Sequence, residues 1–238
     1  MILLRYNYIN QFFLSFSTRL LIAVVFLLTS LILNASQVRG QTAKTIQIKI
    51  EGINKLSRSD ANEIYRIEAY LNSIITMESR FLQISSIGDY SEGTLSLAKP
   101  GKMRLEYDEP NPALLVADGS HLAYFDKELK QVSYFDLQST QAAILLNEKI
   151  SFSSGELIIT AFERGPSVFR LSLIKGSEPN GGTITLILSD KPLRLKKWTI
   201  TDAQGIVTNV SLINPKFGNP LNPNLFVFEE PNKDLQNQ

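Results

Sequence analysis

Few arrangements of side chains in this sequence could perform acid–base chemistry. The 238 residues include one histidine, His121, so a multi-histidine metal centre cannot form and a catalytic triad would depend on that single side chain. His121 follows the turn residues Asp118-Gly119. A surface position is therefore expected, although an imidazole can also sense pH. Glu106, Asp108 and Glu109 could support general acid–base catalysis. Glu106 lies on the polar side of an alternating segment, however, so a solvated rim is the simpler interpretation and no catalytic residue is predicted.

Composition and motifs exclude several other kinds of site. The chain has no cysteine, which excludes a disulfide scaffold, a thiolate metal site and a lipid-anchoring N-terminal cysteine. It has no glycine-rich phosphate loop, nucleophile elbow or metal-ligand spacing, so no cofactor and no metal are expected. A net charge of +1 gives no field that would attract nucleic acid. Arg194, Lys196 and Lys197, next to Trp198, could dock an acidic partner or anionic headgroups. More commonly, basic residues spaced in this way lie on the solvent-exposed outer face of a sheet.

The fold is expected to begin after a targeting segment. Two arginines precede an apolar run, Leu20–Leu33, which has the length of a signal-peptide core and is short for a membrane span of ~20 residues. We therefore predict a signal peptide over residues 1–40, cleaved near Gly40, and a leader over residues 41–58. An uncleaved N-terminal anchor is the alternative.

Helical spacing of apolar residues follows the leader. Ser59 or Asp60 is a candidate N-cap, and the spacing predicts one helix over residues 60–75 with a single apolar stripe. The stripe contains Ile64, Ile67, Leu71, Ile74 and Ile75.

Period-two alternation dominates the chain after Met77. In each such segment apolar and polar residues alternate, so one face of the strand is apolar and the other is wet. Turn sequences with glycine or proline separate the segments, which predicts antiparallel hairpins in one mainly β domain over residues 59–231. The alternating segments are 94–97, 102–107, 169–173, 183–188 and 193–196. One interruption, Ser139–Leu146, is short and amphipathic and predicts one or two helical turns.

A sheet of eight to eleven strands with one apolar face needs a cover. Two small helices cannot cover so large a face completely. The sequence therefore predicts a single unclosed antiparallel β-barrel, with the N-terminal helix and the short helix acting as lids over an apolar cavity. A tightly packed core would carry the same alternation, so the cavity itself is a hypothesis. Residues 232–238 are polar and are predicted to fray.

Two stretches of the chain resemble the LolA family of periplasmic lipoprotein carriers. They are residues 92–107 (EGTLSLAKPGKMRLEY) and residues 115–126 (LVADGSHLAYFD). A helix, a strand–turn–strand unit, an Asp-Gly hairpin, a short helix and a second meander follow one another in the family's order. The likeness covers roughly residues 60–230.

The resemblance implies a hollow that holds acyl chains, and it assigns residues to that hollow. Met103, Leu105 and Tyr107 match lining positions, whereas their alternation alone indicates only core packing. Together with the lid residues, the predicted lipid-cavity set is Ile67, Leu71, Ile74, Leu95, Leu97, Met103, Leu105, Tyr107, Leu145 and Leu146. Family members usually carry an arginine that helps to hold the lid shut. Lys99 stands there in this sequence and is the candidate lid latch, although an ammonium is a point charge and not a planar fork.

The resemblance also implies the partners and the compartment. A monomeric, non-enzymatic chaperone would accept acylated lipoproteins in the periplasm from an inner-membrane lipoprotein-releasing ABC transporter. It would pass them to an outer-membrane acceptor or to the outer membrane itself. A carrier of free lipid or of another small apolar ligand stays an alternative, because the sheet and its lids would be the same.

Overall fold

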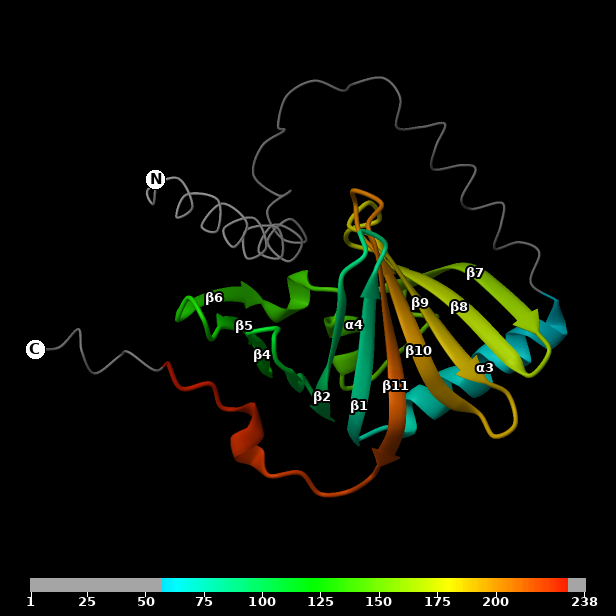
Figure 1. Ribbon diagram of the computed structural model, residues 1–238. Helices are drawn as coiled ribbons and strands as arrows, with labels where there is room; N and C mark the ends of the chain where they lie inside the picture. Colours follow the sequence, from blue (N-terminus) through cyan, green and yellow to red (C-terminus); the bar gives the residue numbers. More distant parts are fainter. Residues whose placement is uncertain (1–56, 231–238) are drawn as a thin grey trace, which may run out of the picture. The chain divides into compact units, whose positions relative to one another are not determined.

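The computed structural model describes residues 57–230 (Figure 1). The predicted signal peptide and its cleavage site lie outside the described residues, as do nearly all of the predicted leader and the tail from residue 231. No helix in the described part of the chain is long and apolar enough to cross a bilayer.

Helix α3 (Arg58–Ser73) begins at a capping box. The Ser57 hydroxyl accepts the backbone N–H of Asp60 at 3.1 Å, and the Asp60 carboxylate accepts the Ser57 N–H at 3.1 Å, which satisfies two donors of the first turn. The prediction of an N-cap at Ser59 or Asp60 is therefore wrong by two or three residues. Ile75, placed on the apolar stripe by its spacing, is 59% exposed because the helix has already ended.

Eleven strands form one antiparallel sheet in the order β6-β5-β4-β3-β2-β1-β11-β10-β9-β8-β7. Strands β6 and β7 are its two free edges, so the barrel is unclosed, as predicted. The first and last strands, β1 and β11, pair at the centre and join the two meanders. The strands are β1 (Thr76–Ser85), β2 (Tyr90–Ala98), β3 (Lys102–Tyr107), β4 (Ala113–Asp118), β5 (His121–Asp126), β6 (Gln131–Asp136), β7 (Leu157–Gly165), β8 (Val168–Lys175), β9 (Thr183–Ser189), β10 (Arg194–Thr201) and β11 (Val207–Phe217).

The predicted short helix is two separate turns in the connection between β6 and β7. A 3₁₀ turn, η2 (Leu137–Ser139), comes first, and a single α-helical turn, α4 (Ala143–Leu146), follows it. Ala143, Ile144 and Leu146 are buried. This connection and α3 cover the same side of the sheet, called the inner face below.

The inner face carries the main core. Alternate residues of the strands point toward α3 and α4 and join one continuous cluster of buried apolar side chains. At β10 the alternation is interrupted, because the pairing with β9 shifts between Leu195 and Lys197. This bulge lets both Leu195 and Trp198, three residues apart, join the same core.

The outer face is apolar in one place, which the sequence prediction of a single apolar face did not include. Leu114, Val116 and Phe125 form a second buried cluster there. Val132 and Phe228 pack against it. Phe228 follows the short turn η3 (Pro223–Phe226), so the C-terminal segment covers this part of the sheet. Strands β4 and β5 are consequently buried on both faces.

Candidate functional site

All ten predicted lipid-cavity residues meet in the core of the inner face. Eight of them are less than 9% exposed, whereas Tyr107 and Leu145 are half-buried at the border of the same cluster. Ile67, Leu71 and Ile74 come from α3 and its C-cap, and the others come from β2, β3 and α4. The lids and the sheet therefore bury one another in this structure.

One small space lies between the lids and the sheet in the described part of the chain. A cavity of about 10 Å³, roughly the room one water needs, is lined by Leu71, Ile74, Met77, Leu97, Lys99, Leu145, Ile150 and Leu195. Met77, Ile150 and Leu195 were missing from the predicted set. Met77 and Leu195 lie on strands and could have been added from their alternation. Ile150 lies in an irregular connection, where no periodicity marks it. An acyl chain fits at this place only if the lids move.

Lys99 lies where a latch would be useful. Its Nζ donates to the Leu71 carbonyl at 2.9 Å, near the end of α3, where the helix dipole leaves partial negative charge. Its backbone N–H donates to the Ile75 carbonyl at 2.8 Å. Burial lowers the pKa of the Lys99 ammonium from 10.5 to about 8. The predicted latch residue thus contacts the lid through a single point donor.

A second lysine, which the sequence did not mark, holds the other lid. Lys175 at the end of β8 is 8% exposed, and its Nζ donates to the carbonyls of Gln138 and Thr140 at 2.5 and 2.6 Å. Burial is the main cause that lowers the pKa of Lys175. Gln141 also donates from Nε2 to the Gly181 carbonyl at 3.1 Å. The segment between η2 and α4 is therefore fixed to the ends of β8 and β9.

Polar contacts also fix α3 to the second meander. Arg164 on β7 pairs with Asp60 at 2.8 Å, and Arg66 pairs with Asp190 at 2.5 Å. The Tyr70 hydroxyl accepts the backbone N–H of Leu195 on β10 at 3.0 Å. The helix thus crosses the inner face from β7 toward β2, with a polar contact in almost every turn.

Two glycines of the sequence motif allow close approaches next to the site. Gly93 lies opposite Phe81, and a Cβ on it would meet the Phe81 ring at 2.7 Å and the Glu106 carbonyl oxygen at 2.2 Å. Phe81 in turn contacts Tyr107 edge to face at 5.2 Å between ring centroids. Gly101, at φ +73°, lies so close to Gly119 that a Cβ would meet its Cα at 2.6 Å. The two motif turns therefore pack directly on each other.

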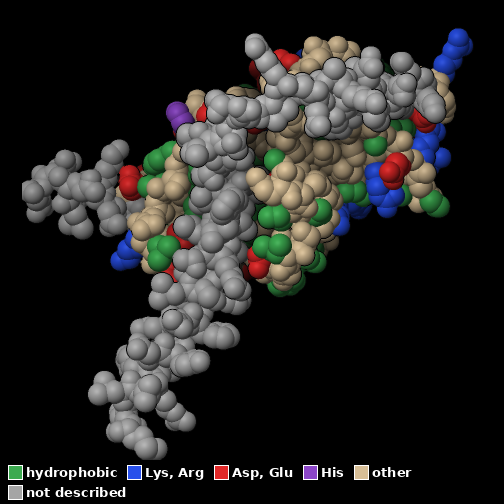
Figure 2. All heavy atoms as spheres, turned by 90° about the horizontal axis from the view of Figure 1, so that it is seen from above, with side chains coloured by type: hydrophobic (Ala, Val, Ile, Leu, Met, Phe, Trp, Pro, Cys, Tyr) green, Lys and Arg blue, Asp and Glu red, His purple; other side chains and the backbone are tan. Residues whose placement is uncertain are grey.

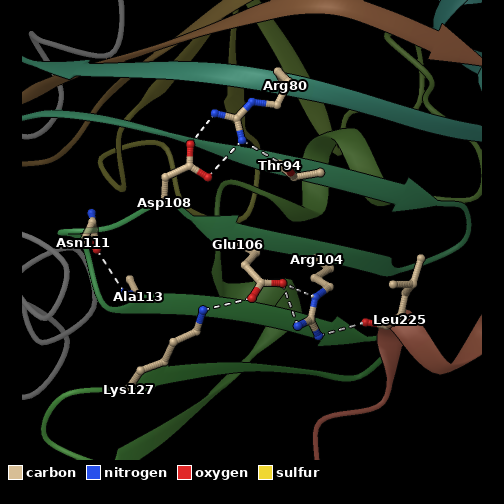
Figure 3. A network of polar contacts seen from close by, with 9 residues as sticks. All are labelled: Arg80, Thr94, Arg104, Glu106, Asp108, Asn111, Ala113, Lys127 and Leu225. Atoms are coloured by element: carbon tan, nitrogen blue, oxygen red, sulfur yellow. Dashed lines mark hydrogen bonds and ion pairs between the residues drawn. The ribbon is translucent and has the colours of Figure 1, made fainter.

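Glu106 and Asp108 of the acidic cluster belong to ion pairs on the outer face (Figure 3). Asp108 pairs with Arg80, and the Arg80 hydrogen bond lowers the pKa of that carboxyl. Glu106 pairs with Lys127 and Arg104, each at 2.9 Å, and these bonds lower the pKa of Glu106. Both groups are held as carboxylates, which is the opposite of what a general acid needs at neutral pH. The solvated-rim interpretation is confirmed.

The remaining polar candidates are also surface groups. His121 is exposed, and no group of acidic, histidine or cysteine side chains in residues 57–230 could hold a metal ion. Arg194 and Lys196 are exposed beside the β10 bulge. On the uncovered part of the face in Figure 2, basic side chains lie mostly toward the right-hand edge, with acidic side chains among them.

The chain is similar in sequence to proteins of one known family. The family model described as "Outer membrane lipoprotein carrier protein LolA" matches residues 72–229. The chain belongs to the LolA family. Proteins named outer-membrane lipoprotein carrier protein include one from Pseudomonas paraeruginosa, 29% identical over 188 residues, which cover 76% of this chain and 89% of that protein. Another, from Legionella pneumophila strain Paris, is 28% identical over 173 residues, which cover 69% of this chain and 84% of that protein.

Solved structures that are similar to this chain include a LolA superfamily protein from Nitrosomonas europaea. It is 11% identical to this chain with a TM-score of 0.43, and the match covers 69% of this chain and 97% of that one. The matched residues 72–229 include the first motif, and Met103 and Leu105 of that motif lie in the core of the inner face.

Proposed function

We propose that this LolA-family chain carries lipoproteins by sheltering their acyl chains between the lids and the inner face of the sheet. The observation that carries the proposal is the way the lids are held. They contact the sheet through apolar side chains and through separate polar contacts, among them the ion pair of Arg164 with Asp60 and the hydrogen bond from Lys99 to Leu71. Such a cover can be displaced by another apolar group of similar size.

The energetics require deep burial of the cargo. An acyl chain of ~15 methylenes, each worth ~0.8 kcal/mol on transfer from water, costs on the order of 10 kcal/mol when exposed. A shallow groove cannot offset that cost. The inner face offers an apolar surface that runs across both meanders, from β3 to β8, once α3 and α4 leave it.

The closed lids also explain how the cargo can be released. Closed lids bury the inner face, and opening them loses that packing. The net affinity for acyl chains falls by the cost of opening. Cargo can then move on to a membrane or to a receptor that binds it more tightly.

Partners and compartment follow from the same proposal. The carrier would work in the periplasm, receive acylated lipoproteins from an inner-membrane ABC transporter and deliver them to an outer-membrane acceptor or to the outer membrane itself. The names of the relatives, outer-membrane lipoprotein carrier protein, support this assignment.

Retention of one lipoprotein in acylated and unacylated form tests the proposal. The purified chain should retain only the acylated form. Leu105→Glu, which places a charge on the inner face, should lose retention while its far-ultraviolet circular dichroism keeps the β signal. The matched control is Ile84→Glu, because Ile84 is 45% exposed; this variant should bind as the unchanged chain does.

Two results would contradict the proposal. Normal retention by Leu105→Glu would mean that the acyl chains bind elsewhere. Equal retention of both forms of the lipoprotein would mean that the acyl chain is not what is recognised. Mass spectrometry of co-purified material gives an independent reading, since a free-lipid carrier would yield phospholipid instead of lipopeptide.

A further inference from the structure

The connection after α4 is tied to α3 by side chains that the sheet does not use. The Asn72 side chain forms a reciprocal pair with the backbone of Ile150. Its Nδ2 donates to the Ile150 carbonyl at 2.8 Å, and its Oδ1 accepts the Ile150 N–H at 2.8 Å. One turn earlier on the same face of the helix, Glu68 Oε2 accepts the N–H of Phe152 at 2.7 Å. Residues 150–152 thus run alongside α3, antiparallel to it.

These three hydrogen bonds connect the two lids to each other. Ile150 is 1% exposed and lines the cavity together with Leu71 of α3 and Leu145 of α4. If α3 left the sheet alone, both backbone groups of Ile150 would lose their partners in an apolar surrounding, at the full cost of unpaired buried polar groups. Leaving together keeps all three bonds. Opening as one unit is therefore the less costly movement.

We propose that Asn72, assisted by Glu68, is a positioning residue that couples α3 and the η2–α4 connection, so that both lids open as one unit. The inference rests on the proposed function only in giving these elements the role of lids. The structural coupling itself requires no cargo. In that unit, Lys99, Tyr70 and the ion pairs of α3 with Arg164 and Asp190 hold the α3 side to the sheet. Lys175 and Gln141 hold the η2 side.

Hydrogen exchange in the empty carrier tests this coupling. Tyr70→Phe removes the bond to the Leu195 N–H and touches only α3, whereas Lys175→Met removes the bonds to Gln138 and Thr140 and touches only the other lid. If the lids are coupled, each substitution speeds exchange in both lids by the same factor. That factor is roughly fivefold for the one hydrogen bond lost in Tyr70→Phe, and larger for the two lost in Lys175→Met. The amides to read are those within α3 and those of residues 145–147, which bond within α4. Amides of β1 and β11 serve as the reference and should not change.

Removing the coupling residue should separate the two responses. When Tyr70→Phe is added to a chain that already carries Asn72→Leu, amide exchange should become faster in α3. The exchange rates of residues 145–147 should not change. Ser73→Ala is the matched control, because Ser73 bonds only to the Tyr70 carbonyl of its own helix; it should leave the coupling intact. If Asn72→Leu does not fold, Glu68→Ala can be used instead. It removes one of the three hydrogen bonds between the lids, so the exchange responses of α3 and of residues 145–147 should separate only in part.

The proposal is overturned if Tyr70→Phe or Lys175→Met, in the otherwise unchanged chain, alters the exchange of its own lid alone. It is also overturned if the common response persists in Asn72→Leu. Because no lipoprotein enters the experiment, these outcomes are independent of whether acylated cargo is retained.

Discussion

At the scale of single residues, two ammonium groups hold the lids, and both use backbone carbonyls as acceptors. Lys99 reaches the end of α3, and Lys175 reaches the η2 segment. A carbonyl offsets the loss of hydration less completely than a carboxylate does, so burial lowers the pKa of each lysine. Contacts of this kind are cheaper to break than a buried ion pair, which suits a cover that has to open.

The pKa of Lys99 gives a pH dependence with a defined sign. Its pKa is about 8 in the closed chain and 10.5 in the unfolded chain, so between these values the unfolded state binds more protons. Stability therefore rises with pH in that window, and the cost of the buried charge is fully present below pH 8. Relative to Lys99→Met, the unchanged chain should gain roughly 1–2 kcal/mol from pH 7.5 to pH 10, after allowance for solvent screening at a partly buried group.

Urea unfolding of both proteins at the two pH values measures this difference. Lys99→Arg is the control, because a guanidinium keeps its charge throughout the range and should show no such gain over Lys99→Met. A difference between the unchanged chain and Lys99→Met that stays constant with pH would show that Lys99 is not desolvated in solution.

At the scale of elements, the sequence predicts what periodicity controls. The α3 stripe and the alternation of β2, β3, β8 and β9 follow from one apolar face per element, and these are the elements that build the site. The predictions fail where another principle replaces alternation. Ala113–Ala117 (ALLVA) does not alternate because β4 is buried on both faces, and the β10 bulge shifts the pattern at Lys196.

The lids show a different limit of sequence reading. Lys175, Asn72 and Ile150 act through hydrogen bonds between a side chain and a distant backbone. Such bonds leave no regular spacing in the sequence from which they could be predicted, because any donor that the fold brings near a carbonyl can form them. Lys99 could be named in advance only through the family resemblance. The cavity residue Ile150 lies in an irregular connection and had no signal at all.

Gly93 provides a test of how tightly the first motif is packed. A methyl group at this position meets the Phe81 ring and a backbone oxygen of β3, so the strands must shift to admit it. Gly93→Ala should lower the free energy of unfolding by about 1–3 kcal/mol, although alanine is otherwise better suited than glycine to a strand. Thr94→Ala, the next residue with its side chain on the outer face, should change it by less than about 0.5 kcal/mol. Chemical denaturation gives both values, and equal effects of the two substitutions would contradict the close packing.

At the scale of the whole molecule, the sheet carries two apolar regions with two different covers. The inner face is covered by α3 and the β6–β7 connection, which the sheet holds through side chains and single polar contacts. The outer cluster of Leu114, Val116 and Phe125 is covered by the C-terminal segment. Arg104 helps to place that segment, since its guanidinium donates to the Leu225 carbonyl at 3.4 Å. The two covers lie on opposite faces, so their contributions to function can be separated.

A substitution at Phe228 can separate the contribution of the outer cover from that of the lids. The Phe228 ring lies 5.5 Å from that of Phe125 and 6.3 Å from that of Tyr134, measured between centroids. Phe228→Ser should therefore lower the free energy of unfolding by about 2 kcal/mol, as expected for a half-buried aromatic side chain. Because the substitution leaves the inner face and both lids unchanged, retention of acylated lipoprotein below the unfolding temperature should stay as it is, in contrast to Leu105→Glu. A thermal unfolding curve and a retention assay on the same preparation measure both effects. Loss of retention without loss of stability would mean that the outer cover takes part in carrying cargo, and that the division of labour between the two faces is wrong.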